Sequence, residues 1–120
     1  MAKVLIIDDD PDFQEFVCAL FELEGYEPHA AFDGPTGLEL YEQVHPDVIL
    51  LDVMMPGMDG YEVCRRLRND LGSTTPVIFV SARAEDQDLD RGREAGADDY
   101  VTKPFDFPRL METVARHVKV

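Results

Sequence analysis

Three short runs of consecutive apolar residues constrain the fold of this chain more than any other feature. They cover residues 4–7, 48–51 and 77–80. A strand that is apolar at every position is typical of the centre of a parallel sheet, where both faces are buried, although a buried helix segment has the same pattern. A polar residue follows each run at once. Because ligands bind at the carboxyl ends of the strands in open parallel sheets, these polar residues are candidates for a functional site.

Segments with helical patterns separate the runs, and two weaker strands complete the series. Residues 27–31 include Pro28, which cannot donate a hydrogen bond to a neighbouring strand, so this strand is expected at an edge of the sheet. Residues 99–102 form a short last strand. Five successive strand and helix units predict one parallel sheet with helices on both faces, connected by right-handed crossovers.

Two of the predicted helices differ in how firmly they should pack. The first begins after Asp10, a suitable N-cap, with Pro11 at its first position. Its apolar face is expected to comprise Phe13, Phe16, Val17, Leu20 and Phe21. The helix at residues 84–95 offers only Ala84, Leu89 and Ala95 as apolar anchors among many charged residues. We therefore expect this helix to be held weakly.

Composition excludes several classes of protein. With 120 residues, the chain is expected to form one domain over residues 1–120. Its net charge of -14 would repel nucleic acids and anionic membrane surfaces, so we expect neither as a direct partner. No apolar stretch approaches the length of a signal peptide's apolar region or of a membrane span. Cys18 and Cys64 lack a partner at metal or redox spacing, which indicates thiols in a reducing compartment and a cytoplasmic location.

The polar residues after the strands form a group that needs a joint explanation. Asp8 and Asp9 follow the first apolar run and Asp52 the second, while Ser81 follows the third and Lys103 the last strand. Each alone is unremarkable, since an aspartate after a strand often begins a turn or caps a helix. In a parallel sheet, however, the carboxyl ends of all strands lie on the same side, so these residues are expected close together. Carboxylates a few ångströms apart repel one another by roughly 1 to 4 kcal/mol per pair, so a cation is expected, and an all-oxygen site suits Mg²⁺.

This group of side chains is suited to phosphoryl transfer. A carboxylate can attack phosphorus and form an acyl phosphate, and the protein then supplies positive charge around the phosphoryl oxygens. The metal ion would contact one oxygen, the Lys103 ammonium group a second, and the Ser81 hydroxyl with backbone N–H groups a third. Before the reaction, Lys103 is expected to pair with Asp52.

The same motifs, in this order, resemble the response-regulator receiver domains of two-component signalling, of the chemotaxis-regulator-like kind, over essentially all 120 residues. They read Val-Leu-Ile-Ile-Asp8-Asp9, then Pro46-Asp47-Val-Ile-Leu-Leu-Asp52 with Met-Pro-Gly-Met-Asp-Gly, then Val-Ser81-Ala, and last Gly-Ala-Asp-Asp-Tyr100-Val-Thr-Lys103-Pro104-Phe. The resemblance implies a flavodoxin-like, doubly wound sheet of five parallel strands in the order 2-1-3-4-5, with helices on both faces. It also implies a cis peptide bond between Lys103 and Pro104.

By this resemblance, Asp52 is the phosphoacceptor for a histidine kinase or a phosphotransfer protein. Asp9 is a direct ligand of Mg²⁺, Asp8 acts largely through water, and the carbonyl group of Met54 completes the protein ligands together with Asp52. Such a domain is a signalling switch and not an enzyme in the usual sense, because it catalyses only its own phosphorylation and autodephosphorylation.

The resemblance also implies how the signal is passed on. Ser81 and Tyr100 correspond to the hydroxyl and aromatic switch pair of the family. A change over residues 81–101 then controls a downstream protein or an output domain, or pairs two copies of the chain, through the face formed by the fourth helix, the last strand and the last helix. Met54 and Arg83 hold the positions that tune loss of the phosphoryl group. Neither is an acid or an amide that would position water, so we expect slow autodephosphorylation.

Three other roles compete with this interpretation. An aspartyl-phosphate-forming phosphohydrolase uses similar groups, but such enzymes have Asp-x-Asp at the nucleophile, where this chain has Met54. A flavin-binding electron-transfer module needs a phosphate-binding loop after the first strand, whereas Asp8-Asp9-Asp10 would repel phosphate. An acidic metal-binding domain without chemistry would gain no mass from a phosphodonor.

Overall fold

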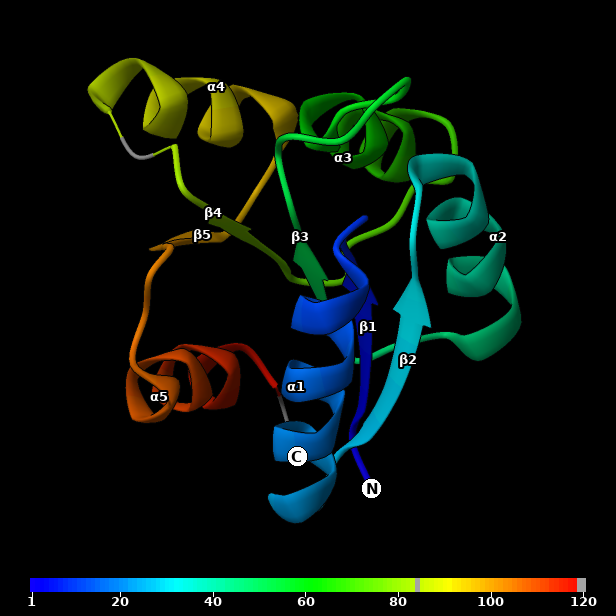
Figure 1. Ribbon diagram of the computed structural model, residues 1–120. Helices are drawn as coiled ribbons and strands as arrows, with labels where there is room; N and C mark the ends of the chain where they lie inside the picture. Colours follow the sequence, from blue (N-terminus) through cyan, green and yellow to red (C-terminus); the bar gives the residue numbers. More distant parts are fainter. Residues whose placement is uncertain (84, 119–120) are drawn as a thin grey trace.

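The structure, a computed structural model, describes residues 1–83 and 85–118. Within these residues, five strands alternate with five helices (Figure 1). The elements are β1 (Lys3–Ile7), α1 (Pro11–Leu23), β2 (Glu27–Ala31), α2 (Gly34–Val44), β3 (Val48–Leu51), α3 (Gly60–Asn69), β4 (Val77–Ser81), α4 (Asp86–Ala95), β5 (Asp99–Thr102) and α5 (Phe107–His117). The strands pair in parallel in the order β2-β1-β3-β4-β5, which confirms the expected doubly wound sheet.

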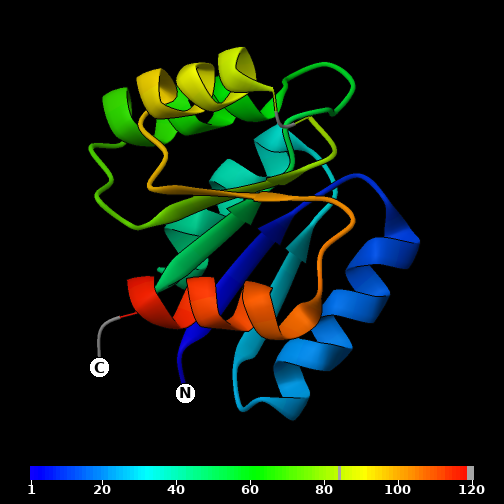
Figure 2. The ribbon, with the colours of Figure 1, turned by 90° about the vertical axis from the view of Figure 1, so that its left-hand side faces the viewer.

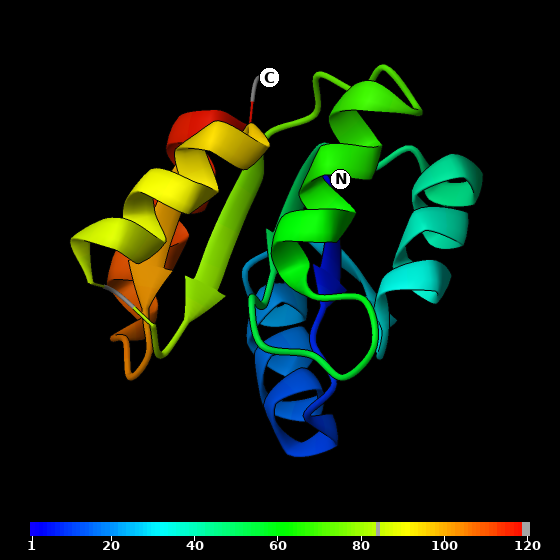
Figure 3. The ribbon, with the colours of Figure 1, turned by 90° about the horizontal axis from the view of Figure 1, so that it is seen from above.

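The helices cover both faces of this sheet. α1 and α5 lie on one face and α2, α3 and α4 on the other (Figure 2), and α3 lies between α2 and α4 (Figure 3). Alternate residues of a strand point to opposite faces, so β1 directs Val4 and Ile6 toward α1 and α5, and Leu5 and Ile7 toward the other three helices. The all-apolar strands are therefore buried on both faces, as predicted.

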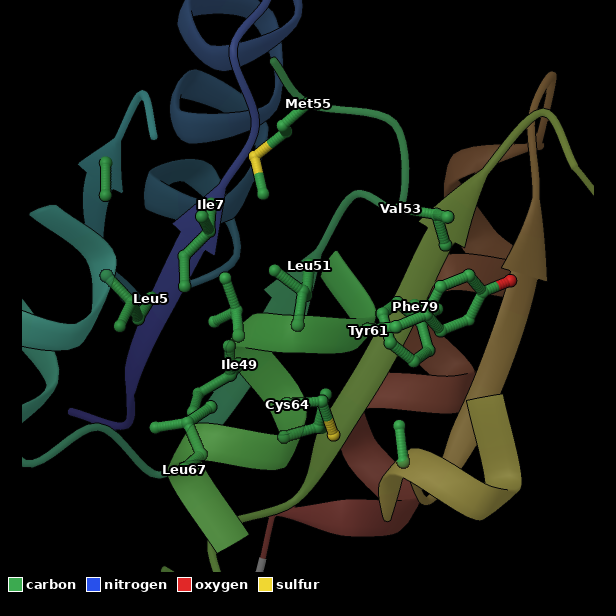
Figure 4. Close-up of a cluster of buried hydrophobic side chains, with 14 residues drawn as sticks. Leu5, Ile7, Ile49, Leu51, Val53, Met55, Tyr61, Cys64, Leu67 and Phe79 are labelled. Atoms are coloured by element: carbon green, nitrogen blue, oxygen red, sulfur yellow. The ribbon is translucent and has the colours of Figure 1, made fainter. Parts of the chain in front are cut away.

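Figure 4 shows the side of the core that supports α3. Side chains from β1 and β3 meet the buried face of this helix, which includes Cys64 and Leu67. Tyr61, in its first turn, packs edge-on against Phe79 of β4 with ring centroids 5.4 Å apart. Full burial of a large apolar side chain contributes about 1.5 to 3 kcal/mol. This layer therefore fixes α3, and with it the loop that follows β3, against the sheet.

The edge strand follows the expectation from sequence. β2 pairs only with β1 among the described strands, so Pro28 lies at the edge of the sheet. The peptide bond between Lys103 and Pro104 is cis, as the resemblance implied. In the described part of the chain, no helix combines the length and apolar character needed to cross a membrane.

The apolar face of α1 differs from the prediction at one position. Asp10 caps the helix as expected, and Gln14, Val17 and Phe21 form its buried stripe. Phe16 is 61% exposed, so its predicted burial is wrong. Successive helical residues are about 100° apart, which places Phe16 on the side opposite to this stripe. The apolar pattern did not show this because a polar residue, Gln14, occupies one of the buried positions.

α4 has few apolar contacts, as its sequence indicated. Its buried residues are Asp88, Gly92 and Ala95, and Leu89 is half-buried. The expected first residue of the helix, Ala84, lies outside the described residues. A Cβ atom on Gly92 would lie 3.3 Å from the ring of Phe79 and 3.4 Å from that of Tyr100, so this glycine lets α4 approach the sheet closely. Weak anchoring of α4 stays a prediction.

Candidate functional site

The pairing of the strands brings the acidic side chains together. Ile7 of β1 and Leu51 of β3 are partners in the sheet register, so the next residues, Asp8 and Asp52, leave adjacent strands side by side. The N–H group of Asp52 donates to the carbonyl oxygen of Ile7 at 2.9 Å. One carboxylate oxygen from each of Asp8, Asp9 and Asp52 lies within 4.8 Å of the others. The structure therefore groups the three carboxylates that the sequence placed at strand ends.

Burial makes the negative charges of these carboxylates energetically unfavourable. Asp8 is 1% exposed and Asp52 8% exposed, whereas Asp9 lies at the surface. The pKa of Asp52 is raised from 3.8 to about 6, mainly by burial and to a smaller extent by the negative charge of Asp8. The charge of Lys103 and two backbone N–H groups of the following loop act in the opposite direction. The balance shows that negative charge at Asp52 is not fully compensated by the protein itself.

The oxygens of this group fit a divalent cation. Mg²⁺ binds oxygen ligands about 2.0 to 2.1 Å away and commonly keeps several water molecules. Carboxylate oxygens within 4.8 Å of one another are therefore within reach of one such ion, directly or through water. A cation there would offset the repulsion between Asp8 and Asp52. The donor set and its spacing are typical of a metal site.

Lys103 reaches this group from the end of β5. Its Nζ atom lies 2.8 Å from Oδ2 of Asp8 and 4.0 Å from the centre of the Phe13 ring. The pairing with Asp8 differs from the sequence-based expectation, which placed Lys103 on Asp52. Oδ1 of Asp8 accepts a hydrogen bond from the Asp10 N–H group at 3.0 Å, which leaves Oδ2 free to bind the ammonium group.

Ser81 and Tyr100 are both bonded to the backbone of Arg83. Ser81 is fully buried, and its Oγ atom accepts a hydrogen bond from the Arg83 N–H group at 3.2 Å. The Tyr100 hydroxyl donates to the carbonyl oxygen of Arg83, and its ring packs against Phe79 with centroids 5.7 Å apart. Burial, and next the neighbouring Tyr61, raise the pKa of Tyr100 to about 12, so the hydroxyl stays protonated. The two expected switch residues thus meet at one backbone segment.

The loop after β3 bends back on itself beside Asp52. The N–H group of Gly60 donates to the carbonyl oxygen of Val53 at 2.9 Å. A Cβ atom on Gly60 would lie 2.2 Å from the carbonyl oxygen of Asp52, so only glycine permits this approach. Met54 is 53% exposed on the same loop. Its role as a metal ligand concerns its backbone carbonyl group and stays a prediction.

Reasoning from sequence missed the contacts that two residues of α1 make with the site. Gln14 is buried. Its Nε2 atom lies within hydrogen-bond distance of the carbonyl oxygens of Ile6 (2.8 Å), Ala31 (2.9 Å) and Asp8 (3.1 Å), so it ties the ends of β1 and β2 together beneath the acidic group. The other residue is Phe13, whose ring lies against the ammonium group described above. A polar residue at a buried helical position was a signal for Gln14, but no spacing indicated the contact of Phe13.

Residues 4–115 match the family model described as the response regulator receiver domain. A curated relative, the DNA-binding dual master transcriptional regulator RpaA of Synechocystis sp., is 44% identical over 115 residues, which are 95% of this chain and 48% of the relative. The structure of the Vibrio cholerae chemotaxis protein CheY4 has a TM-score of 0.92 and 31% identity, and 98% of each chain is covered. The receiver domain of the Francisella response regulator 1452 has a TM-score of 0.92 and 37% identity, with 98% of this chain and 97% of that chain covered. The chain spans about half the length of four of the curated relatives it matches and a quarter of the length of a fifth.

Proposed function

This chain belongs to the family of response regulator receiver domains, and we propose that Asp52 is its phosphoacceptor. A receiver domain is a phosphorylation switch and not a classical enzyme. One observation supports the choice of Asp52 most directly, namely its position at the end of the central strand β3, 8% exposed and grouped with the carboxylates of Asp8 and Asp9. Because ligands of doubly wound sheets bind at this edge, its carboxylate is placed to meet an incoming phosphoryl group.

In the proposed reaction, a carboxylate oxygen of Asp52 attacks the phosphorus atom of a phosphohistidine on a histidine kinase or phosphotransfer protein. An O–P bond forms, the P–N bond of the donor breaks, and the imidazole leaves with the electron pair. The attacking carboxylate must be ionised, and with a pKa of about 6 most of it is ionised at pH 7. The product is an acyl phosphate on Asp52.

We propose that Mg²⁺ is the cofactor and that Asp8, Asp9, Asp52 and the backbone carbonyl group of Met54 hold it. When bound, the ion would neutralise charge on the carboxylates and on the phosphoryl oxygens. The all-oxygen donor set, with carboxylate oxygens within 4.8 Å of one another, supports this assignment.

Lys103 and Ser81 are proposed to stabilise the bound phosphoryl group. The Lys103 ammonium group, 2.8 Å from Asp8, is a compact cation on a flexible stem, so it can turn toward a phosphoryl oxygen. The Ser81 Oγ atom accepts one hydrogen bond and has its own hydrogen to donate to a second oxygen. Both contacts need the phosphoryl group, so they would stabilise the phosphorylated state selectively.

The switch is proposed to act through the backbone of Arg83. Ser81 and Tyr100 bind the N–H and carbonyl groups of this residue, so movement of Ser81 toward a phosphoryl group would displace the acceptor of Tyr100. A shift from almost fully inactive to almost fully active needs about 5 kcal/mol, which the new contacts and a bound partner would share. Amide hydrogen exchange across residues 85–101 should change on phosphorylation, and unchanged exchange would contradict this mechanism.

The face formed by α4, β5 and α5 is proposed to bind the next protein in the signalling pathway. That partner is a downstream protein, an output domain or a second copy of this chain. With a net charge of -14, the domain itself is not proposed to bind nucleic acid or an anionic membrane. We further propose that residues 1–120 form one receiver domain that acts in the cytoplasm with its histidine kinase.

Intact mass after incubation with acetyl phosphate and Mg²⁺ tests this function. The native protein should gain the mass of one phosphoryl group, and Asp52→Asn should gain none. Asp47→Asn is a matched control, because Asp47 is exposed and precedes the amino end of β3, whereas Asp52 follows its carboxyl end. This variant should react like the native protein. No gain in the native protein, or an equal gain in Asp52→Asn, would refute the assignment.

A further inference from the structure

We propose that Phe13 is a positioning residue for phosphorylation, because its ring holds the ammonium group of Lys103 beside the phosphoryl site. This inference rests on the proposed roles of Asp52 and Lys103 and extends them to a side chain of α1. Phe13 also packs against the core cluster between the sheet and α1. A contribution to packing alone is therefore the competing explanation that the experiment must separate.

The geometry joins the ring directly to the cation. The Nζ atom of Lys103 lies 4.0 Å from the centre of the Phe13 ring and 2.8 Å from Oδ2 of Asp8. A cation within about 6 Å of an aromatic face is attracted by the quadrupole of the ring, and more strongly when water is excluded. The side chain of Lys103 is only 24% exposed. The ring and the Asp8 carboxylate therefore both contact the ammonium group and jointly fix its position.

The ring is the fixed partner in this contact. Phe105 packs edge-to-face against Phe13, with centroids 6.1 Å apart and an interplanar angle of 85°. The backbone of Phe13 is held by the helix cap, because its N–H group donates to Oδ1 of Asp10 at 3.3 Å. Lysine, by contrast, has a flexible four-carbon stem. Phe13 thus limits where the Lys103 ammonium group can lie.

A neutral ring suits this role better than a second carboxylate would. Asp8 is proposed to serve the metal site as well, so its hold on the ammonium group competes with that use. The Phe13 ring carries no net charge and does not compete for the metal ion or for phosphoryl oxygens. The ring can stay in contact with the ammonium group while that group moves from Asp8 to the phosphoryl group.

Phosphorylation rates of three variants test the contact. With acetyl phosphate and Mg²⁺, Phe13→Leu should react about fivefold more slowly, which corresponds to about 1 kcal/mol of lost stabilisation. Phe13→Tyr keeps an aromatic face and should stay within about twofold of the native rate. Phe16→Leu is the matched control, since Phe16 lies on the same helix with 61% exposure, and its rate should be unchanged. Equal rates for Phe13→Leu and the native protein would overturn the proposal.

A double-mutant cycle separates this role from packing. If the ring acts through the ammonium group, Phe13→Leu should cause no further loss of rate in a Lys103→Met background, and the two substitutions should be non-additive in urea unfolding. Equal effects of Phe13→Leu with and without Lys103, in both measurements, would show that the ring acts by packing alone.

Nuclear magnetic resonance tests the contact without any phosphorylation. The ε-methylene protons of Lys103 should be shifted upfield by the ring in the native protein and in Phe13→Tyr, and this shift should vanish in Phe13→Leu. An unshifted Lys103 signal would overturn the positioning role even in a protein that is phosphorylated on Asp52. A native protein that gains no phosphoryl group would instead refute the proposed function, which keeps the two failures distinct.

Discussion

Replacing Asp52 by asparagine should stabilise the metal-free protein at neutral pH, and the gain should shrink as the pH falls. The pKa of Asp52 is raised from 3.8 to about 6 in the folded protein. Between these values the folded state binds more protons than the unfolded state, so stability rises as the pH falls through about 6 and this gain is complete near 3.8. Above pH 6, the ionised side chain therefore opposes folding.

The size of the effect follows from the raised pKa. A tenfold change in proton affinity is worth about 1.4 kcal/mol, so the ionised Asp52 carboxylate destabilises the fold by about 3 kcal/mol at pH 7.5. Because the folded protein is largely protonated at this site at pH 5, the cost there is about half as large. Asparagine has the same shape and no charge, so Asp52→Asn should remove the cost at both pH values.

Urea unfolding in the presence of a metal chelator measures the prediction. The free energy of unfolding of Asp52→Asn should exceed that of the native protein by about 3 kcal/mol at pH 7.5 and by about half as much at pH 5. Glu39→Gln, at an exposed position in the middle of α2, should differ from the native protein by less than about 0.5 kcal/mol at either pH. A gain that is equal at both pH values, or a loss at pH 7.5, would refute the raised pKa.

Four further outcomes are expected. Mg²⁺ at about 100 times its dissociation constant should raise the unfolding free energy of the native protein by about 2.7 kcal/mol, measured by urea unfolding, and an unchanged value would contradict the metal site. Gly60→Ala should slow phosphorylation, because its Cβ atom would lie 2.2 Å from a backbone oxygen. The control is Gly72→Ala, where φ is 62° and the space around the glycine is open. This variant should be less stable but should be phosphorylated at the native rate. Gln14→Leu should destabilise the protein by about 1 to 3 kcal/mol in urea unfolding, since buried carbonyl oxygens lose their donor, and a neutral result would show that they find other partners. The phosphoryl group should be lost slowly from the native protein, as followed by intact mass. Met54→Asn adds an amide able to position water and should shorten the lifetime of the phosphorylated protein. Arg83→Ala adds no such group and should not shorten it.

The fold was readable from the sequence because its strongest signals are local. All-apolar strands, Pro28 in an edge strand and the Asp10 cap each follow from a short segment and a single physical rule. The grouping of Asp8, Asp9 and Asp52 followed from one further fact, that parallel strands end at a common edge. Each of these inferences needed no side-chain geometry.

What the sequence did not show depends on the direction of individual side chains. Phe16 was expected in the core, but Gln14 takes a place in the buried stripe because its amide group satisfies backbone carbonyl oxygens at the strand ends. Lys103 was expected on Asp52, yet the structure pairs it with Asp8, on the side where the Phe13 ring lies. These contacts join residues far apart in the chain, and no periodic pattern encodes them.

Chemical trapping of the phosphorylated residue is the most direct test of the proposed switch. After reaction with acetyl phosphate and Mg²⁺, borohydride reduces an acyl phosphate to an alcohol, and peptide mass spectrometry locates the reduced side chain. We predict that reduction occurs at position 52 alone. Reduction at position 8 or 9, or reduction nowhere in a protein that has gained a phosphoryl group, would contradict the assignment of Asp52 as the phosphoacceptor.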